Sequence, residues 1–146
     1  MERNFNEQGD NQETNPMEGA MTGSDILWLA MCIFFEARGE PLEGQLGVAH
    51  VVINRSINRN IPIEAVIKQS NQFSWYNKDS RFKTVFKEMK SYFDCVVVVY
   101  KCAEERQAGK NFGGANYFFN PSLANPSWAK KFELVKVVSN HAFYRG

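Results

Sequence analysis

The sequence predicts an α+β domain that is mainly helical and has a small antiparallel β element towards its C-terminal end. Residues 26–35 form an unbroken apolar run, which is typical of a buried helix. Residues 115–144 instead combine short apolar stretches with Asn-Pro-Ser and Ser-Asn turn signals, which favour strands. With 146 residues, 44% of them hydrophobic, the chain has room for one packed domain.

The first helix is predicted to cross the centre of the core. Ser24 resembles a helix cap, and Asp25 places an acid in the first turn. The following run, residues 26–35, is apolar on every face, so each face of this helix needs a buried neighbour. Arg38 and Gly39 then provide a stop signal.

Two further helices are expected before residue 70. Pro41 suits the start of the second helix, and Gly47 in its interior would allow another segment to approach closely. We expect this helix to end in a polar break at residues 54–60, and a short third helix to follow at residues 62–69. The apolar positions of the second helix are Leu42, Leu46, Ala49 and Ile53, which recur at helical spacing.

The second half of the chain is predicted to begin with an aromatic loop at residues 70–81. One long helix should follow over residues 80–110, although the four valines at 96–99 could equally form a strand. Residues 115–119 are predicted to be a strand, and residues 135–144 two strands around a Ser-Asn turn. The side chains expected to face inward from the long helix are Phe82, Val85, Met89 and Phe93.

Residues 1–23 are predicted to be a flexible acidic arm that precedes a domain spanning residues 24–146. The arm contains one Arg and five acidic residues, whereas the rest of the chain has a net charge of +5. That excess favours a polyanionic partner, such as nucleic acid, an anionic membrane or the bacterial cell wall. The arm lacks the pattern of a secretory signal, and no apolar run is long enough to span a membrane. We therefore expect synthesis in the cytoplasm without a signal peptide and no integral membrane segment.

The three cysteines, Cys32, Cys95 and Cys102, form an odd set without paired metal-ligand spacing. We expect reduced, buried thiols and neither a disulfide framework nor a metal site. The sequence contains no phosphate-binding glycine loop, HExxH pattern or nucleic-acid motif. We therefore expect no cofactor and no nucleic-acid partner, while the oligomeric state stays open.

Glu36 is the first candidate for catalysis, because it is the ionisable residue that ends the apolar run. A carboxyl packed against Phe34 and Phe35 would have a raised pKa and could donate a proton near neutral pH. The alternative is a solvated Glu36 that pairs with Arg38 or Arg55. Composition alone favours the second interpretation.

Other ionisable residues offer weaker candidates. Glu40, Glu43 and Asp79 could supply a second carboxylate for glycoside chemistry, but helix-start positions explain the first two and loop solvation explains Asp79. His50 lies too far along its helix to partner the candidate acid. His141 is better placed for a cleft, although a lone His in a strand is more often a structural residue.

Aromatic residues in the predicted loops and short strands suit the flat faces of sugars or bases. Ordinary core filling is the other interpretation, because strand alternation turns about half of residues 117–119 inward. The set comprises Trp75, Tyr76, Tyr117, Phe118, Phe119 and Trp128.

Four segments carry a resemblance to a known family. LAMCIFFEARGEPLEGQLGVAHVVINR at residues 29–55 is followed in order by QFSWYNKD at 72–79, ANYFFNPSLANPSWA at 115–129 and SNHAFYR at 139–145. In this order they resemble the bacterial cell wall hydrolase family typified by spore cortex-lytic enzymes. The resemblance implies a lysozyme-like fold, mainly helical, with a small antiparallel β element lining a sugar cleft.

The resemblance also implies cleavage of peptidoglycan glycan strands without a metal or organic cofactor. The Glu of the E-A-R-G-E motif, Glu36, is the implied catalytic acid. Ser74, Tyr117 and His141 fall in the other motifs and, together with the aromatic Trp75, are expected to bind the substrate.

The expected activity is that of a lytic transglycosylase cutting between N-acetylmuramic acid and N-acetylglucosamine, with one Glu acting as acid and then base. The alternatives are a muramidase, which needs a second carboxylate, and a peptidoglycan-binding or virion module without catalysis. Because the sequence contains neither a secretion signal nor a separate wall-binding domain, we expect a bacteriophage endolysin that acts on the host wall.

Overall fold

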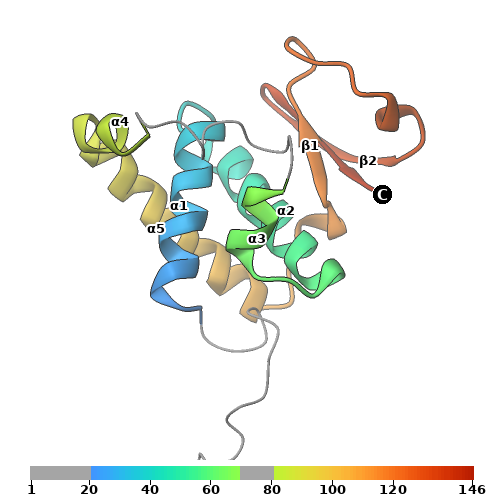
Figure 1. The fold of residues 1–146 in the computed structure, drawn as a ribbon. Coiled ribbons are helices and arrows are strands. Elements are labelled where there is room, and N and C mark those ends of the chain that lie inside the picture. Colours follow the sequence, from blue (N-terminus) through green and yellow to red (C-terminus); the bar gives the residue numbers. More distant parts are fainter. Residues whose placement is uncertain (1–20, 70–80) are drawn as a thin grey trace, which may run out of the picture.

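The computed structural model describes residues 21–69 and 81–146, and it confirms the predicted mainly helical α+β class. Within these residues, a group of helices lies beside a three-stranded antiparallel sheet (Figure 1). The helices are α1 (Gly23–Ala37), α2 (Leu42–Arg59), α3 (Ile63–Lys68), α4 (Arg81–Lys87) and α5 (Met89–Gln107), with short 3-10 turns η2 (Phe112–Gly114) and η3 (Ser127–Lys130). The strands are β1 (Tyr117–Phe119), β2 (Glu133–Val138) and β3 (His141–Arg145).

Helix α1 begins at a capping box formed by Thr22 and Asp25. The Thr22 hydroxyl accepts from the Asp25 backbone N–H, and the Asp25 carboxylate accepts from the Thr22 N–H, both at 3.1 Å. The predicted cap at Ser24 is therefore wrong by two residues, because a Thr with an acid three positions later satisfies two free N–H groups at once. The predicted stop is confirmed, since Arg38 caps the helix end. Residues 1–20 lie outside the described residues, so the acidic arm stays a prediction.

Helix α2 continues through residues 54–59 and ends at Asn60, although the whole stretch 54–60 is predicted to be a break. Asn54, Arg55 and Ser56 are buried, and each side chain donates to a backbone carbonyl. Hydrogen bonds therefore compensate the burial of these polar groups and keep the helix intact. The acceptors are the carbonyls of Ala115 at 2.7 Å, Asn116 at 2.6 Å and Ile61 at 2.6 Å, respectively.

The predicted helix over residues 80–110 is two helices. Glu88 separates α4 from α5 and has non-helical backbone angles, φ −120° and ψ 49°. The valines at 96–99 belong to α5, so their strand alternative is wrong. Because α5 starts a new helical phase after the break, its buried residues are Tyr92, Cys95, Val98, Val99 and Cys102. Of the side chains predicted to face inward, Val85 is buried, Met89 is half-buried, Phe93 is 59% exposed, and Phe82 lies outside the described side chains.

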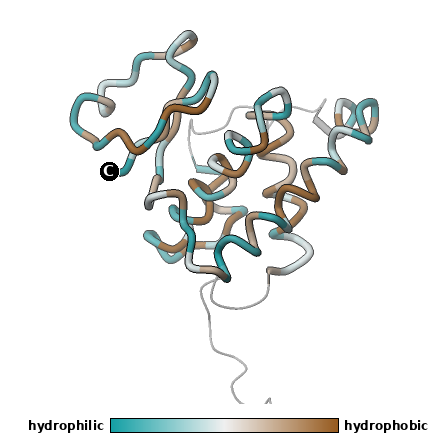
Figure 2. The backbone as a smooth tube through the Cα atoms, turned by 180° about the vertical axis from the view of Figure 1, so that it is seen from behind, coloured by the Kyte–Doolittle hydropathy of each residue, from teal (hydrophilic) through white to brown (hydrophobic). Residues whose placement is uncertain are grey.

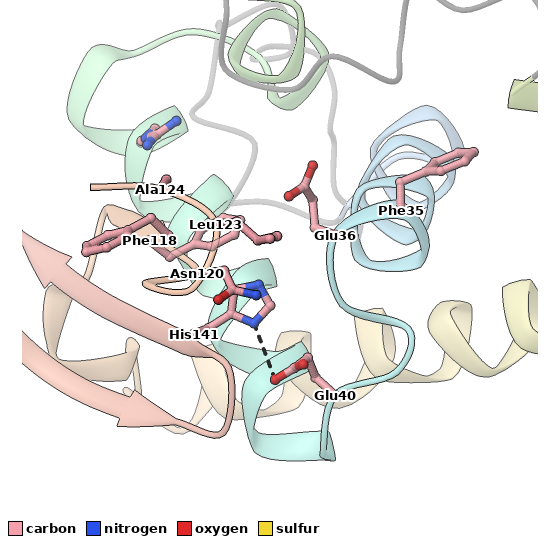
Figure 3. Close-up of a pocket in the computed structure, with 10 residues that line it drawn as sticks. Phe35, Glu36, Glu40, Phe118, Asn120, Leu123, Ala124 and His141 are labelled. Atoms are coloured by element: carbon pink, nitrogen blue, oxygen red, sulfur yellow. Dashed lines mark ion pairs between the residues drawn. The ribbon is translucent and has the colours of Figure 1, made fainter. Parts of the chain in front are cut away.

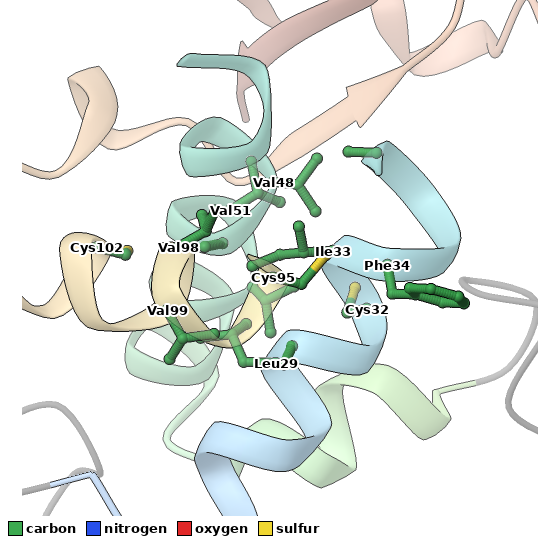
Figure 4. Close-up of a cluster of buried hydrophobic side chains, with 14 of the residues drawn as sticks. Leu29, Cys32, Ile33, Phe34, Val48, Val51, Cys95, Val98, Val99 and Cys102 are labelled. Atoms are coloured by element: carbon green, nitrogen blue, oxygen red, sulfur yellow. The ribbon is translucent and has the colours of Figure 1, made fainter. Parts of the chain in front are cut away.

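Helices α1, α2 and α5 enclose the hydrophobic core (Figure 4). Brown, apolar stretches lie along the inner parts of the helical group, while several of its turns are teal and hydrophilic (Figure 2). All three cysteines are reduced and buried here, as predicted. Burial raises the pKa of Cys95 to about 11 and that of Cys102 to about 12. None of the described helices combines the length and the apolar character that crossing a membrane requires.

The sheet has the strand order β1-β3-β2 and lies next to α2 (Figure 1). Strands β2 and β3 form the predicted hairpin around Ser139 and Asn140, and β3 also pairs with β1. The first Asn-Pro-Ser unit forms a turn, in which the Leu123 N–H donates to the Asn120 carbonyl at 2.9 Å. The second unit leads into η3. The end of α1 and the turn after β1 are thereby brought to the same side of the molecule.

Candidate functional site

A pocket of about 390 Å³ lies between the end of α1 and the sheet (Figure 3). Its walls come from α1, the connection from α1 to α2, α2 itself, β1 with the following turn, and β3. Segments distant in the sequence therefore meet at one cavity. The lining residues are Phe35, Glu36, Glu40, Arg55, Phe118, Phe119, Asn120, Leu123, Ala124 and His141.

Glu36 occupies the last turn of α1, where the apolar run reaches the pocket. Its side chain projects from the helix into the pocket, on the side that faces Leu123 and His141 (Figure 3). The residue is half-buried. One of the pairings considered for Glu36 involves Arg38, but the Arg38 guanidinium lies 3.4 Å from the Glu88 carboxylate instead. The position of Glu36 suits a proton donor, because one side faces apolar helix residues and the other faces a cavity.

Arg55 places a cation in the wall of the same pocket. Its Nε donates to the Asn116 carbonyl at 2.6 Å, and its guanidinium lies 4.6 Å from the centre of the Tyr117 ring. Burial, together with the charge of Arg59, lowers the pKa of Arg55 to about 10. The side chain therefore stays positively charged at neutral pH.

Glu40 and His141 lie close together in the wall of the pocket. The distance from His141 Nδ1 to Glu40 Oε1 is 3.4 Å, and both side chains are nearly buried. Glu40 also accepts from the Asn140 backbone N–H at 3.1 Å and from its Nδ2 at 2.8 Å. Burial opposes ionisation of Glu40, but these hydrogen bonds and His141 outweigh it and hold the pKa below the usual 4.5. Glu40 is therefore a second carboxylate of the pocket, and it is ionised at neutral pH.

The structure brings together some of the predicted site residues and not others. Glu36 and His141 line the pocket, whereas Tyr117 lies beside it. Tyr117 packs against Trp128 and Phe132, with ring centres 5.0 and 4.7 Å away. The Arg55 guanidinium lies over the face of the Tyr117 ring. Two other predicted substrate-binding residues, Ser74 and Trp75, lie outside the described residues, as does Asp79.

Two other weaker candidates lie away from the pocket. Glu43 is exposed in the first turn of α2 and pairs with Lys136 of β2. His50 is buried between α2 and α5, where it bonds Glu105. The helix-start interpretation of Glu43 and the expectation that His50 does not partner Glu36 fit these positions.

The sequence patterns do not identify several of the pocket residues. Arg55 is predicted only as a possible partner of Glu36, because the expected break at residues 54–60 gives no indication that it is buried. Asn120 and Leu123 lie in and directly after an Asn-Pro-Ser unit, which is predicted only as a turn. Leu123 is 82% exposed at the rim, and an apolar side chain in a polar turn is the signal that could have identified it.

No set of three or more His, Cys, Asp or Glu side chains in the described part of the chain is arranged to hold a metal ion.

The chain is similar to known proteins over most of its length. The profile of the family described as cell wall hydrolase matches residues 39–144. The spore cortex-lytic enzyme of Bacillus cereus is 28% identical over 134 residues, which are 91% of this chain and 48% of that protein. The enzyme of the same name from Halalkalibacterium halodurans is 28% identical over 123 residues, 82% of this chain and 34% of that protein. The chain thus spans between a third and a half of these relatives.

Solved structures match over a larger share of their own length. The catalytic domain of the germination-specific lytic transglycosylase SleB from Bacillus anthracis has a TM-score of 0.64 at 25% identity, covering 87% of this chain and 98% of that domain. The catalytic domain of the Bacillus cereus SleB protein gives a TM-score of 0.67 at 25% identity, covering 92% and 99%. The family match begins at Gly39, three residues after Glu36.

Proposed function

Because the chain belongs to the cell wall hydrolase family, we propose that it cleaves peptidoglycan glycan strands between N-acetylmuramic acid and N-acetylglucosamine, as a lytic transglycosylase. The observation that carries the proposal is the half-buried Glu36 carboxyl, which projects from the end of an apolar helix into the pocket. Further support comes from the SleB catalytic domain, which is described as a germination-specific lytic transglycosylase.

In the proposed reaction, Glu36 acts first as an acid and then as a base. Its carboxyl gives a proton to the glycosidic oxygen as the bond from that oxygen to C1 of the muramic sugar breaks. The sugar's own 6-hydroxyl then attacks C1, and the Glu36 carboxylate takes the hydroxyl proton. The products are a 1,6-anhydromuramic end and a free hydroxyl on the neighbouring sugar, and Glu36 is protonated again.

The pocket contains groups that fit this cycle. Phe35 and Phe118 provide apolar walls, which limit water near the reacting carbon and so favour attack by the sugar's own hydroxyl. The buried Arg55 cation lines the same cavity as Glu36, so it offsets part of the negative charge that proton transfer leaves in the pocket.

A muramidase is the second candidate, because Glu40 supplies a second carboxylate in the pocket. Both Glu40 oxygens already interact with the hairpin, however: Oε2 accepts from the Asn140 side chain, while Oε1 accepts from its backbone and faces His141. A nucleophile or a base for water needs an oxygen directed at the substrate. This engagement favours the transglycosylase.

Mass spectrometry of purified peptidoglycan digested with the wild type and with Glu36→Gln tests the activity. We expect anhydromuramic ends with the wild type, and a loss of turnover of about a thousandfold or more in the variant. The matched control is Glu43→Gln, which changes an exposed carboxylate paired with Lys136 and should retain activity. Reducing, hydrated ends would instead establish the muramidase.

A binding module without catalysis predicts that neither protein releases glycan fragments and that both still sediment with peptidoglycan. The expected role in phage-mediated host lysis also stays a prediction. It requires that the protein lyses permeabilised cells when added from outside, while expression in the cytoplasm alone leaves cells intact.

A further inference from the structure

The contact between Glu40 and His141 has no task in the acid-base chemistry of Glu36. His141 Nδ1 is buried and makes no hydrogen bond within the described residues, and the charged atom facing it is Glu40 Oε1 at 3.4 Å. A carboxylate oxygen only accepts hydrogen bonds, so an Nδ1 lone pair pointed at it would be repelled. The favoured arrangement places the imidazole hydrogen on Nδ1.

The Glu40 carboxylate cannot turn away from His141 without losing other bonds. Asn140 donates to it through both the backbone and the side chain, and these bonds keep the pKa of Glu40 below its usual range against the effect of burial. The negative charge therefore stays beside Nδ1, held between the start of α2 and the hairpin turn.

The His141 ring is fixed by its aromatic neighbours. Phe118 meets the ring edge-on at a centroid distance of 5.2 Å, and Phe143 lies 6.1 Å away. With Nδ1 turned to Glu40, the opposite nitrogen, Nε2, lies on the pocket side of the ring (Figure 3). In the neutral ring with hydrogen on Nδ1, Nε2 carries the lone pair and accepts hydrogen bonds.

We propose that His141 binds a hydroxyl group of the glycan through Nε2 of its neutral ring, and that Glu40 is the positioning residue that keeps the hydrogen of that neutral ring on Nδ1, so that Nε2 accepts. This inference rests on the proposed function, because it assigns the hydroxyl to a sugar in the pocket. Among the described residues, the other charged groups that line the pocket are Glu36, which donates in its acid form, and Arg55, which only donates. An accepting nitrogen completes the set needed to hold a sugar hydroxyl, whose hydrogen must find an acceptor.

The tautomer can be measured without substrate by ¹⁵N–¹H correlation spectra of the full chain at pH 8. His50 is the other histidine of the sequence and serves as an internal reference. Its Nδ1 faces the Arg106 guanidinium at 3.1 Å, which only donates, and its Nε2 faces Glu105 at 2.8 Å. We expect hydrogen on Nδ1 of His141 and on Nε2 of His50, and Glu40→Gln should alter the signals of His141 alone. A His141 with hydrogen on Nε2, or one indifferent to Glu40→Gln, overturns the proposal.

Kinetics on glycan strands test the task of Nε2. His141→Phe keeps an aromatic ring between Phe118 and Phe143 but removes the acceptor, and we expect a loss of about tenfold or more in kcat/KM. His141→Gln restores an acceptor and should recover part of that loss. Because Glu40 acts through His141, adding Glu40→Gln to His141→Phe should cause no further loss. Additive losses, or equal activities of the Phe and Gln variants, refute the assignment.

Binding separates this proposal from the proposed function. In the Glu36→Gln protein, a disaccharide of N-acetylglucosamine and N-acetylmuramic acid should shift the ¹⁵N signal of His141 Nε2 and leave that of His50 unchanged. If the wild type cleaves glycan but this signal does not move, the role of His141 is wrong while the enzyme stands. If the signal moves but no glycan is cleaved, the binding role stands and the proposed catalysis fails.

Discussion

The two histidines of this chain are both nearly inaccessible to solvent, yet their surroundings differ completely. His50 lies between α2 and α5 with both ring nitrogens engaged, one by Glu105 at 2.8 Å and the other by Arg106 at 3.1 Å. His141 begins β3, has one nitrogen turned to Glu40 at 3.4 Å, and lines a cavity with the rest of its ring.

The difference teaches how a buried polar residue divides its bonds between structure and function. At His50, every hydrogen-bonding atom of the ring has a partner inside the protein, and Arg106 also reaches Asn54 at 2.9 Å. Such a closed network stabilises the fold and has no bond left for a ligand. At His141, Nε2 is on the side of the open pocket, where it has no protein partner among the described residues. It therefore adds little to stability but is free to bind a ligand.

The largest effect on stability should follow from His50→Phe. Phenylalanine keeps a ring near Phe112 but leaves Glu105 and Arg106 without their buried partner. We expect the free energy of unfolding to fall by about 3 kcal/mol. Urea titration followed by circular dichroism measures the change. Turnover per folded molecule should remain that of the wild type, and a selective loss of turnover would break the comparison.

Gly47 links the two regions, and Gly47→Ala should have the next largest effect. A Cβ at this position would lie 2.6 Å from Cζ of Phe143 and 2.8 Å from Cζ of Phe112. Phe112 stacks on His50, and Phe143 lies beside His141. Both phenylalanine rings must move to make room for the new methyl group. We expect a loss of about 2 kcal/mol in unfolding free energy. An unchanged midpoint in urea would show that both rings relax freely.

The pH dependence of stability should report on His50. Burial lowers its pKa below the usual 6.5, Arg106 adds to this shift, and Glu105 opposes it. The unfolded chain therefore binds a proton at a higher pH than the folded protein does. Stability from this residue is complete above about pH 6.5 and falls as the pH drops towards the folded pKa, by at most about 1.4 kcal/mol per pH unit.

Urea titrations from pH 8 to pH 5 on the wild type and His50→Phe isolate this contribution. The variant should show a smaller decline between pH 6.5 and 5 than the wild type. The lowered pKa of Glu40 also makes the folded protein less stable in acid, but only below pH 4.5. In that range the carboxylate of the unfolded chain becomes protonated before that of the folded protein. Parallel curves for the two proteins above pH 5 would contradict the assignment to His50.

The smallest effect on stability is expected from His141→Phe. The substitution removes one neighbour of Glu40, which keeps both bonds from Asn140, and the new ring still packs beside Phe118. We expect a change below about 1 kcal/mol in urea unfolding. The same substitution would thus affect stability at residue 50 and activity at residue 141, which is the sharpest form of the comparison.

Local patterns predicted much of the fold. The apolar run of α1, the proline at the start of α2 and the turn between β2 and β3 each depend on neighbours in the sequence, so their elements could be placed in advance. The expected break at residues 54–60 failed for the opposite reason. Asn54 and Arg55 remain helical because the carbonyls of Ala115 and Asn116, 61 positions later, accept their hydrogen bonds, and no local pattern contains those partners.

The candidate site divides in the same way. By itself the sequence determined an acid at the end of a buried helix, a β hairpin carrying His141, and a resemblance that links the two. Only the tertiary structure decided that Glu40 lies beside His141, which follows it by 101 positions in the sequence. It also decided that Arg55 is buried in the wall of the same pocket and that Tyr117 packs beside that pocket. The physical reason is that helix and turn preferences act over a few residues, whereas a pocket forms where separate segments pack against each other.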